Sequence, residues 1–138
     1  MIQNWPTLLA KFIADNKKRP FEWGAFDCCL FAADAVQIIT GKDYAERFRG
    51  RYKSKSGATK AIRAAGFESL SDVLCGLLGE AKTGINIQRG AVCLVDSQLG
   101  PAAGIFFGGV VWTTGPEGLV ALPLNKVLCF WSIEECRQ

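Results

Sequence analysis

The chain has 138 residues, of which 49% are hydrophobic and 21% are charged, and its formal net charge is +3. It contains no histidine, so it lacks the usual general base at neutral pH and the commonest metal ligand in proteins. A Ser-His-Asp triad, a Cys-His dyad and a histidine-containing zinc site are therefore excluded for this chain alone. The length predicts a single domain over residues 1–138. No apolar run reaches the roughly 20 residues that span a bilayer.

The six cysteines are expected to be free thiols. Residues 1–6 lack the charged-then-apolar layout of a signal peptide, so we expect the chain to fold in a reducing cytosol. A disulfide between distant cysteines remains an alternative if the chain is assembled into an exported particle. No Cys-x-x-Cys spacing occurs, and we therefore expect no metal and no cofactor. Cys93 and Cys129 are expected in the core, and Cys136 near the surface.

Helices are predicted in the first part of the chain. Apolar residues at helical spacing indicate four of them, over residues 4–16, 28–40, 57–65 and 69–78. Asp27 is the expected N-cap of the second helix, and Ser56 the expected N-cap of the third. The second helix is apolar almost all round, which is typical of a helix inside a core.

Strands are predicted in the rest of the chain. From about residue 85, short apolar runs broken by glycine favour strands over residues 91–96, 103–107, 109–113, 118–122 and 127–132. Helices followed by strands are typical of the α+β class. We therefore predict N-terminal helices packed on a C-terminal antiparallel sheet.

The segment that carries chemistry is residues 23–31, which read Trp-Gly-Ala-Phe-Asp-Cys-Cys-Leu-Phe. Cys28 falls in the first turn of the second helix, where the helix dipole and unpaired N–H groups lower the pKa of a thiol. That position suits a nucleophile, but the sequence supplies no base. Cys28 equally fits a small thiol buried in a helix interface, with Cys29 in the core.

This segment resembles the NlpC-type branch of the papain-like cysteine peptidases. That family carries a Gly-x-Asp-Cys-Ser-Gly-Phe-like motif at the start of a buried helix. Asp27 and Cys28 match its Asp-Cys pair, so Cys28 falls on the position of the nucleophile. The resemblance implies a papain-like α+β fold and covers about residues 20–130.

Two later segments extend the resemblance. Residues 89–94 are similar to the family's Arg-Gly-Asp-hydrophobic strand, with Ala91 in place of the aspartate. Residues 102–108 are similar to the strand that supplies the catalytic histidine, and the histidine position falls on Ala102. The resemblance thus implies a peptidase fold without its general base, a group typically worth about 10²–10⁴-fold in rate.

Two more motifs, at residues 48–52 and 118–124, resemble small phage and prophage proteins that are similar to tail-tip components. This resemblance implies a structural or assembly component of a phage tail tip or baseplate that is not an enzyme. It would bind other tail-tip proteins and lie in the virion tail after assembly in the bacterial cytoplasm. The alternative is a cell-wall peptidase or amidase acting on peptidoglycan, in which Cys28 uses a non-standard or partner-supplied base.

Charge is spread unevenly along the chain. Residues 1–66 hold twelve positive and six negative side chains, whereas residues 67–138 hold four and seven. Basic residues interleaved with Phe48 and Tyr52 are typical of nucleic-acid surfaces, but no nucleic-acid motif occurs. We expect a protein partner instead, because arginine is favoured at interfaces. The predicted contact residues are Arg47, Arg49, Arg51, Lys53, Phe130 and Trp131.

Overall fold

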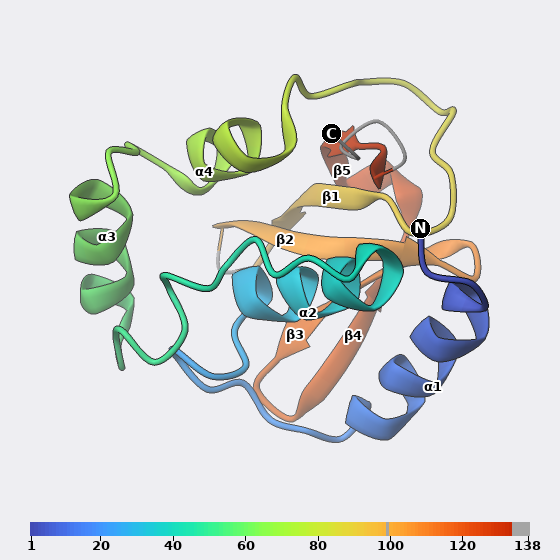
Figure 1. Cartoon of the computed structure of the whole chain (residues 1–138), viewed down its shortest axis with the longest axis horizontal. Helices are drawn as coiled ribbons and strands as arrows, with labels where there is room; N and C mark the ends of the chain where they lie inside the picture. The colour runs from blue at the N-terminus through green and yellow to red at the C-terminus, as the bar shows by residue number, and fades with distance from the viewer. Residues whose placement is uncertain (99, 134–138) are drawn as a thin grey trace.

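The computed structural model describes residues 1–98 and 100–133, and these residues form an α+β fold. In that part of the chain the helices are α1 (Trp5–Asn16), α2 (Cys28–Thr40), α3 (Lys55–Ala64) and α4 (Leu70–Leu78). The strands are β1 (Val92–Ser97), β2 (Gly100–Phe107), β3 (Val110–Gly115), β4 (Gly118–Leu122) and β5 (Val127–Trp131), with a 3-10 turn η1 (Leu124–Lys126) before β5. Every strand pairing is antiparallel, in the order β4-β3-β2-β1-β5. The predicted α+β class is confirmed (Figure 1).

The sheet is curved, and its curvature follows from one short connection. The edge strands β4 and β5 are joined only by residues 123–126, which include η1. Such a stretch spans about 13 Å, because a 3-10 turn rises only about 2 Å per residue. The edges of a flat five-stranded sheet would lie about 19 Å apart. The two edges must therefore bend toward each other, and the curled sheet encloses a core of its own on the face without helices.

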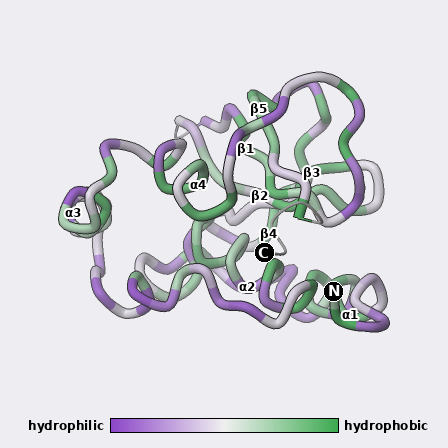
Figure 2. The backbone as a smooth tube through the Cα atoms, turned by 45° about the horizontal axis from the view of Figure 1, so that its top comes forward, coloured by the Kyte–Doolittle hydropathy of each residue, from purple (hydrophilic) through white to green (hydrophobic). Residues whose placement is uncertain are grey.

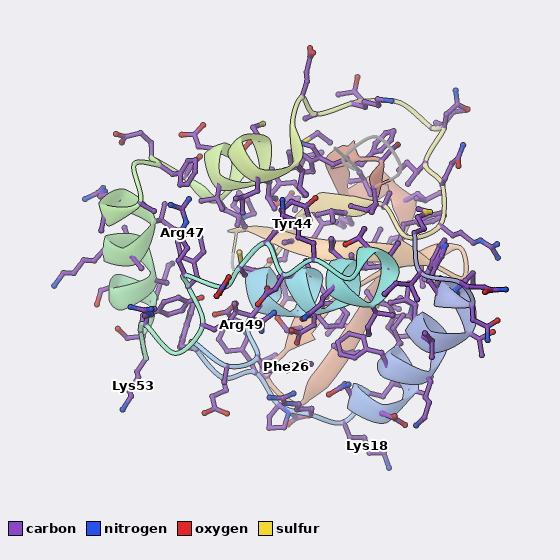
Figure 3. All side chains as sticks on the ribbon, in the orientation of Figure 1. Lys18, Phe26, Tyr44, Arg47, Arg49 and Lys53 are labelled. Carbon is purple, nitrogen blue, oxygen red and sulfur yellow. The ribbon has the colours of Figure 1, made fainter. Side chains whose placement is uncertain are left out.

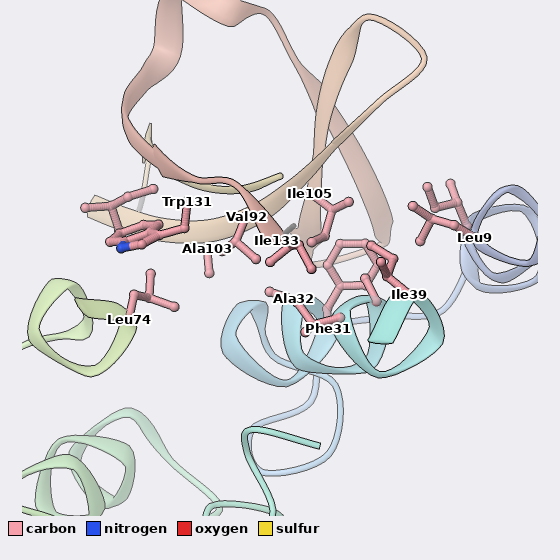
Figure 4. Close-up of a cluster of buried hydrophobic side chains, with 14 of the residues drawn as sticks. Leu9, Phe31, Ala32, Ile39, Leu74, Val92, Ala103, Ile105, Trp131 and Ile133 are labelled. Carbon is pink, nitrogen blue, oxygen red and sulfur yellow. The ribbon is translucent and has the colours of Figure 1, made fainter. Parts of the chain in front are cut away.

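The main core lies between the other face of the sheet and the helices. Alternate residues of β2 face opposite sides, as the pleat of a strand requires, so that Ala103 and Ile105 meet the helices. The helix α2 lies across this face and buries residues on most of its circumference. Figures 2 and 4 show the hydrophobic residues gathered on α2 and the strands, with α1 and α4 closing the sides through Leu9 and Leu74.

Several element boundaries differ from the prediction by a few residues, and two of these differences have a clear local reason. The helix α3 begins at Lys55 because Ser54, and not Ser56, caps it: the Ser54 hydroxyl accepts the Gly57 N–H at 3.0 Å. The strand β2 begins at Gly100 and includes Pro101. Proline is tolerated there because β3 pairs with β2 only from Ile105 onward, so its missing N–H breaks no bond on that side.

The prediction that Phe130 and Trp131 form a partner surface is wrong. They are only 2% and 1% exposed. Phe130 exchanges two backbone hydrogen bonds with Lys82, at 2.8 and 2.9 Å. The indole N–H of Trp131 donates to the Gly79 carbonyl at 3.0 Å. Both residues bind β5 to the segment that follows α4. These two side chains are therefore covered by the chain itself and not by a partner.

The described cysteines are free thiols. Cys93 is buried, as predicted, and Cys129 is partly buried. The expectation for Cys136 lies outside the described residues. Within residues 1–98 and 100–133, no helix combines the length and apolarity needed to cross a membrane.

Candidate functional site

The start of α2 is shaped by Asp27, which caps the helix as predicted. Its backbone is extended, with φ −97° and ψ 177°, and its Oδ1 accepts the Leu30 N–H at 2.9 Å. An aspartate in this position satisfies one of the N–H groups that a helix leaves without partners. Cys28 is therefore the first residue of a capped helix.

The Asp27 carboxylate is buried, at 2% exposure, and is held by donors from two loops. Its Oδ2 accepts the Gly24 N–H at 3.1 Å and the Tyr52 hydroxyl at 2.5 Å. Burial, followed by this bond to Asp27, raises the pKa of the Tyr52 phenol, so the phenol stays protonated and donates. Three donors on one carboxylate compensate for the cost of burying its charge.

Two motifs that are separate in the sequence pack together as one unit. The Gly24 carbonyl accepts the Gly50 N–H at 2.9 Å, which ties the loop before α2 to the 48–52 segment. Gly24 adopts a left-handed φ of +80°, and a Cβ there would overlap the backbone carbonyl of Tyr52. The close approach of the two loops thus requires glycine at this position. Nothing in the sequence of residues 48–52 indicates that Tyr52 contributes to the site.

Arg49 continues this packing onto the side of α2. Its guanidinium lies 2.6 Å from an Asp34 oxygen and 2.8 Å from an Asp43 oxygen. Burial raises the pKa of Asp34 and the nearby Arg49 opposes that rise, whereas the hydrogen bond from Arg49 lowers the pKa of Asp43. Arg49, labelled in Figure 3, thus cross-links α2 to the segment that follows it, and its predicted role as a partner contact stays a prediction.

Cys28 packs partly buried against β2, where the backbone N–H of Ala103 faces its sulfur. Burial raises the pKa of the Cys28 thiol to about 11 and outweighs the N–H groups of Ala103, Cys29 and Cys28, which lower it. This direction is opposite to the one predicted from the helix dipole, because desolvation beside the sheet is the larger effect. The thiol is therefore protonated at neutral pH.

The strand predicted to face Cys28 does so, but through Ala103 and not through Ala102. Ala103 is fully buried on the helix side of the sheet, whereas Ala102 packs into the core on the opposite face. A one-residue shift along a strand reverses the face on which a side chain lies. Both positions hold alanine, so neither can take a proton from the thiol.

Among the described residues, the titratable groups that interact with Cys28 are Asp27, Cys29 and Tyr52. Both oxygens of Asp27 already accept hydrogen bonds, and Tyr52 is a protonated donor. Burial also raises the pKa of Cys29, which lines a narrow apolar crevice between α2 and α4. No group of three or more cysteine or carboxylate side chains within residues 1–98 and 100–133 is placed to bind a metal ion.

The fold and the site define an α+β protein in which a protonated cysteine begins a buried helix and faces Ala103 of an antiparallel sheet. Residues 1–133 match the family model described as "Domain of unknown function (DUF6950)", and the chain belongs to this family. No curated protein matches the chain.

Proposed function

We propose that this protein is a structural or assembly component of a phage tail tip or baseplate, built on a papain-like fold of the NlpC type that has lost catalysis. One observation carries the proposal. A cysteine, Cys28, stands at the start of the buried helix α2 and faces β2. The residue opposite it is Ala103, and the Cys28 thiol is protonated. A nucleophile position without a base suits a scaffold better than a hydrolase.

The order of the elements supports the NlpC-type assignment. The cysteine helix comes first, the strand that follows Arg89 and Gly90 comes next, and the strand that faces the cysteine follows as its antiparallel neighbour. This is the order of the three motifs on which the resemblance rests. The agreement covers the order of the elements, whereas the resemblance places the histidine at Ala102 and the residue that faces α2 is Ala103.

The two phage-like motifs support the structural role, because both are used for internal packing. Residues 48–52 secure the start of α2 through Tyr52. In residues 118–124, the Leu119 N–H donates to the Lys17 carbonyl at 2.8 Å, and a Cβ on Gly118 would overlap that carbonyl. This motif therefore fastens β4 to the end of α1. Neither motif supplies a group for acid–base chemistry.

The retained cysteine is the feature that favours the alternative, a cell-wall peptidase or amidase. For that activity, a partner chain would have to bring a base to a thiol that lies against β2 and is protonated up to about pH 11. The desolvation that raises this pKa acts against formation of the thiolate nucleophile.

Gene deletion in the genome that encodes the protein tests the proposal, with electron microscopy of the particles produced. We expect heads with tails that lack a complete tip or baseplate. Complementation with the wild-type gene and with a Cys28→Ser gene should restore complete tails equally well. Normal tails after deletion would overturn the structural role. Failure of a folded Cys28→Ser protein to complement would favour the enzyme.

A further inference from the structure

The helix α3 stands at one end of the molecule in both views (Figures 1 and 2). This helix and the segment before it are rich in lysine and arginine. We define the cationic face as the six exposed basic residues of α3 and of the segment before it. They are Arg47, Arg51, Lys53, Lys55, Lys60 and Arg63. None of the six forms an ion pair with another described residue.

The helix α3 is amphipathic, and the chain covers only one side of it. Its apolar side, which includes Ala58, Ala61 and Ile62, packs against a small cluster built around Phe48 and Val73. No residue of α3 is fully buried. The outer side, with its lysines and arginine, has no partner within the described residues.

The charge of the cationic face is not balanced locally. Between residues 42 and 63 the acidic residues are Asp43 and Glu46, and Asp43 is already paired with Arg49. Cations that lie closer together than the Debye length of about 10 Å repel one another through solvent. A carboxylate-rich protein surface that packs against α3 would remove this repulsion. The opposite charges would also attract the two proteins before they come into contact.

The aromatic residues of this segment argue against a nucleic acid as the partner. Phe48 is 4% exposed and Tyr52 is 9% exposed, so neither can stack on a base. The Arg47 guanidinium lies over the rings of Phe48 and Phe67, at 5.8 and 5.9 Å from their centres. The basic and aromatic residues that alternate in the sequence are thus separated in the fold: the basic side chains lie at the surface and the aromatic rings lie inside.

We propose that the cationic face binds an acidic surface of another protein. The identity of that protein as a tail component rests on the proposed function, whereas recognition of protein carboxylates by α3 does not. Arg47 and Lys53 lie on the side of the molecule that carries α3 (Figure 3) and extend the face beyond the helix.

Fluorescence anisotropy with two labelled probes of equal charge, a polyglutamate peptide and an oligothymidylate, tests the proposal at low salt. The test variant is Lys55→Glu/Lys60→Glu/Arg63→Glu on α3. The control variant, Lys11→Glu/Lys18→Glu/Lys126→Glu, makes the same change of charge at exposed positions elsewhere. We expect the test variant to bind the peptide at least about tenfold more weakly, and the control variant to stay within about twofold of wild type.

Three results would overturn the proposal: no peptide binding, equal weakening in both variants, or tighter binding of the oligothymidylate than of the peptide. The last result would identify a nucleic-acid surface. The peptide assay is independent of the gene deletion. Peptide binding together with normal tails would contradict only the tail role, and abnormal tails without peptide binding would contradict only the docking surface.

Discussion

The hydroxyl of Tyr52 donates a hydrogen bond to Oδ2 of Asp27, 25 residues earlier in the chain. This bond joins the 48–52 segment to the residue that caps α2, immediately before Cys28. The loop that precedes Cys28 is thus held in place by a buried hydrogen bond.

Replacement of Tyr52 by phenylalanine should lower the free energy of unfolding by about 1.5–3 kcal/mol, the range for hydrogen bonds to charged groups. The ring would still fill its place, but Asp27 would lose one of its three donors. Urea unfolding measures the effect. Tyr52→Phe should cost clearly less in an Asp27→Asn background, and an equal cost in both backgrounds would show that the two residues are not coupled.

Substitution of Gly24 by alanine should be far more damaging than the same change at Gly50. Both glycines have a left-handed φ, of +80° and +69°, so both variants carry the backbone strain of about 1–2 kcal/mol. Only at Gly24 would the new Cβ overlap the Tyr52 carbonyl, whereas nothing lies within 4 Å of the same atom at Gly50. We expect Gly24→Ala to cost at least about 2 kcal/mol more in urea unfolding. Equal losses would contradict the close packing of the two loops.

Replacement of Arg49 by methionine should cost about 1–2 kcal/mol, because Asp34 and Asp43 would both lose their partner. Arg51→Met is the matched control: Arg51 lies two residues away, is exposed and has no ion pair with the described residues. The control should change stability by less than about 0.5 kcal/mol. Thermal unfolding of both variants checks the difference, and similar stabilities would argue against an internal role for Arg49.

Alkylation by iodoacetamide should modify Cys75 well before Cys28 at pH 7, because Cys75 is exposed and the pKa of Cys28 is raised to about 11. The rate at Cys28 should rise about tenfold per pH unit up to that value, since the thiolate is the reactive form. Peptide mapping by mass spectrometry follows both thiols in one sample. Faster modification of Cys28 than of Cys75 at pH 7 would indicate an activated nucleophile.

The same raised pKa sets the direction of a stability change. The unfolded chain releases the Cys28 proton near pH 9.0 and the folded chain near pH 11, so the folded state binds more protons between these values. Stability should therefore fall as the pH rises through that window. Cys28→Ser should make the fall less steep, and an unchanged slope would show that the thiol titrates alike in both states.

Local signals predicted the start of α2 correctly, whereas the cap of α3 was expected at Ser56 and lies at Ser54. The cap at Asp27 and the bounds of α2 could be predicted because capping and apolar periodicity depend on neighbouring residues. The contact between Tyr52 and Asp27 could not, because nothing in residues 48–52 specifies a partner so far along the chain. Basic and aromatic residues alternate in that segment in the same way whether the rings are buried or exposed, so the sequence could not distinguish the two placements.

Other errors arose where two placements share one pattern. The strand at Ala102 was expected to face Cys28, but Ala103 is the residue that faces it, because a shift of one residue along a strand exchanges the two faces of the sheet. Phe130 and Trp131 gave an apolar run that fits a core and a docking strand equally well. The pKa of Cys28 depends on how closely β2 covers it, and that distance is a property of the tertiary structure.

The most direct test of the central claim, a peptidase-like site without catalysis, is a cleavage assay on purified peptidoglycan peptides at neutral pH. Wild-type protein and the Cys28→Ser variant are compared, with an active NlpC-type peptidase as the positive control for the substrate. The account predicts no cleavage above buffer by either protein. Cleavage by the wild type that is abolished by Cys28→Ser would contradict it.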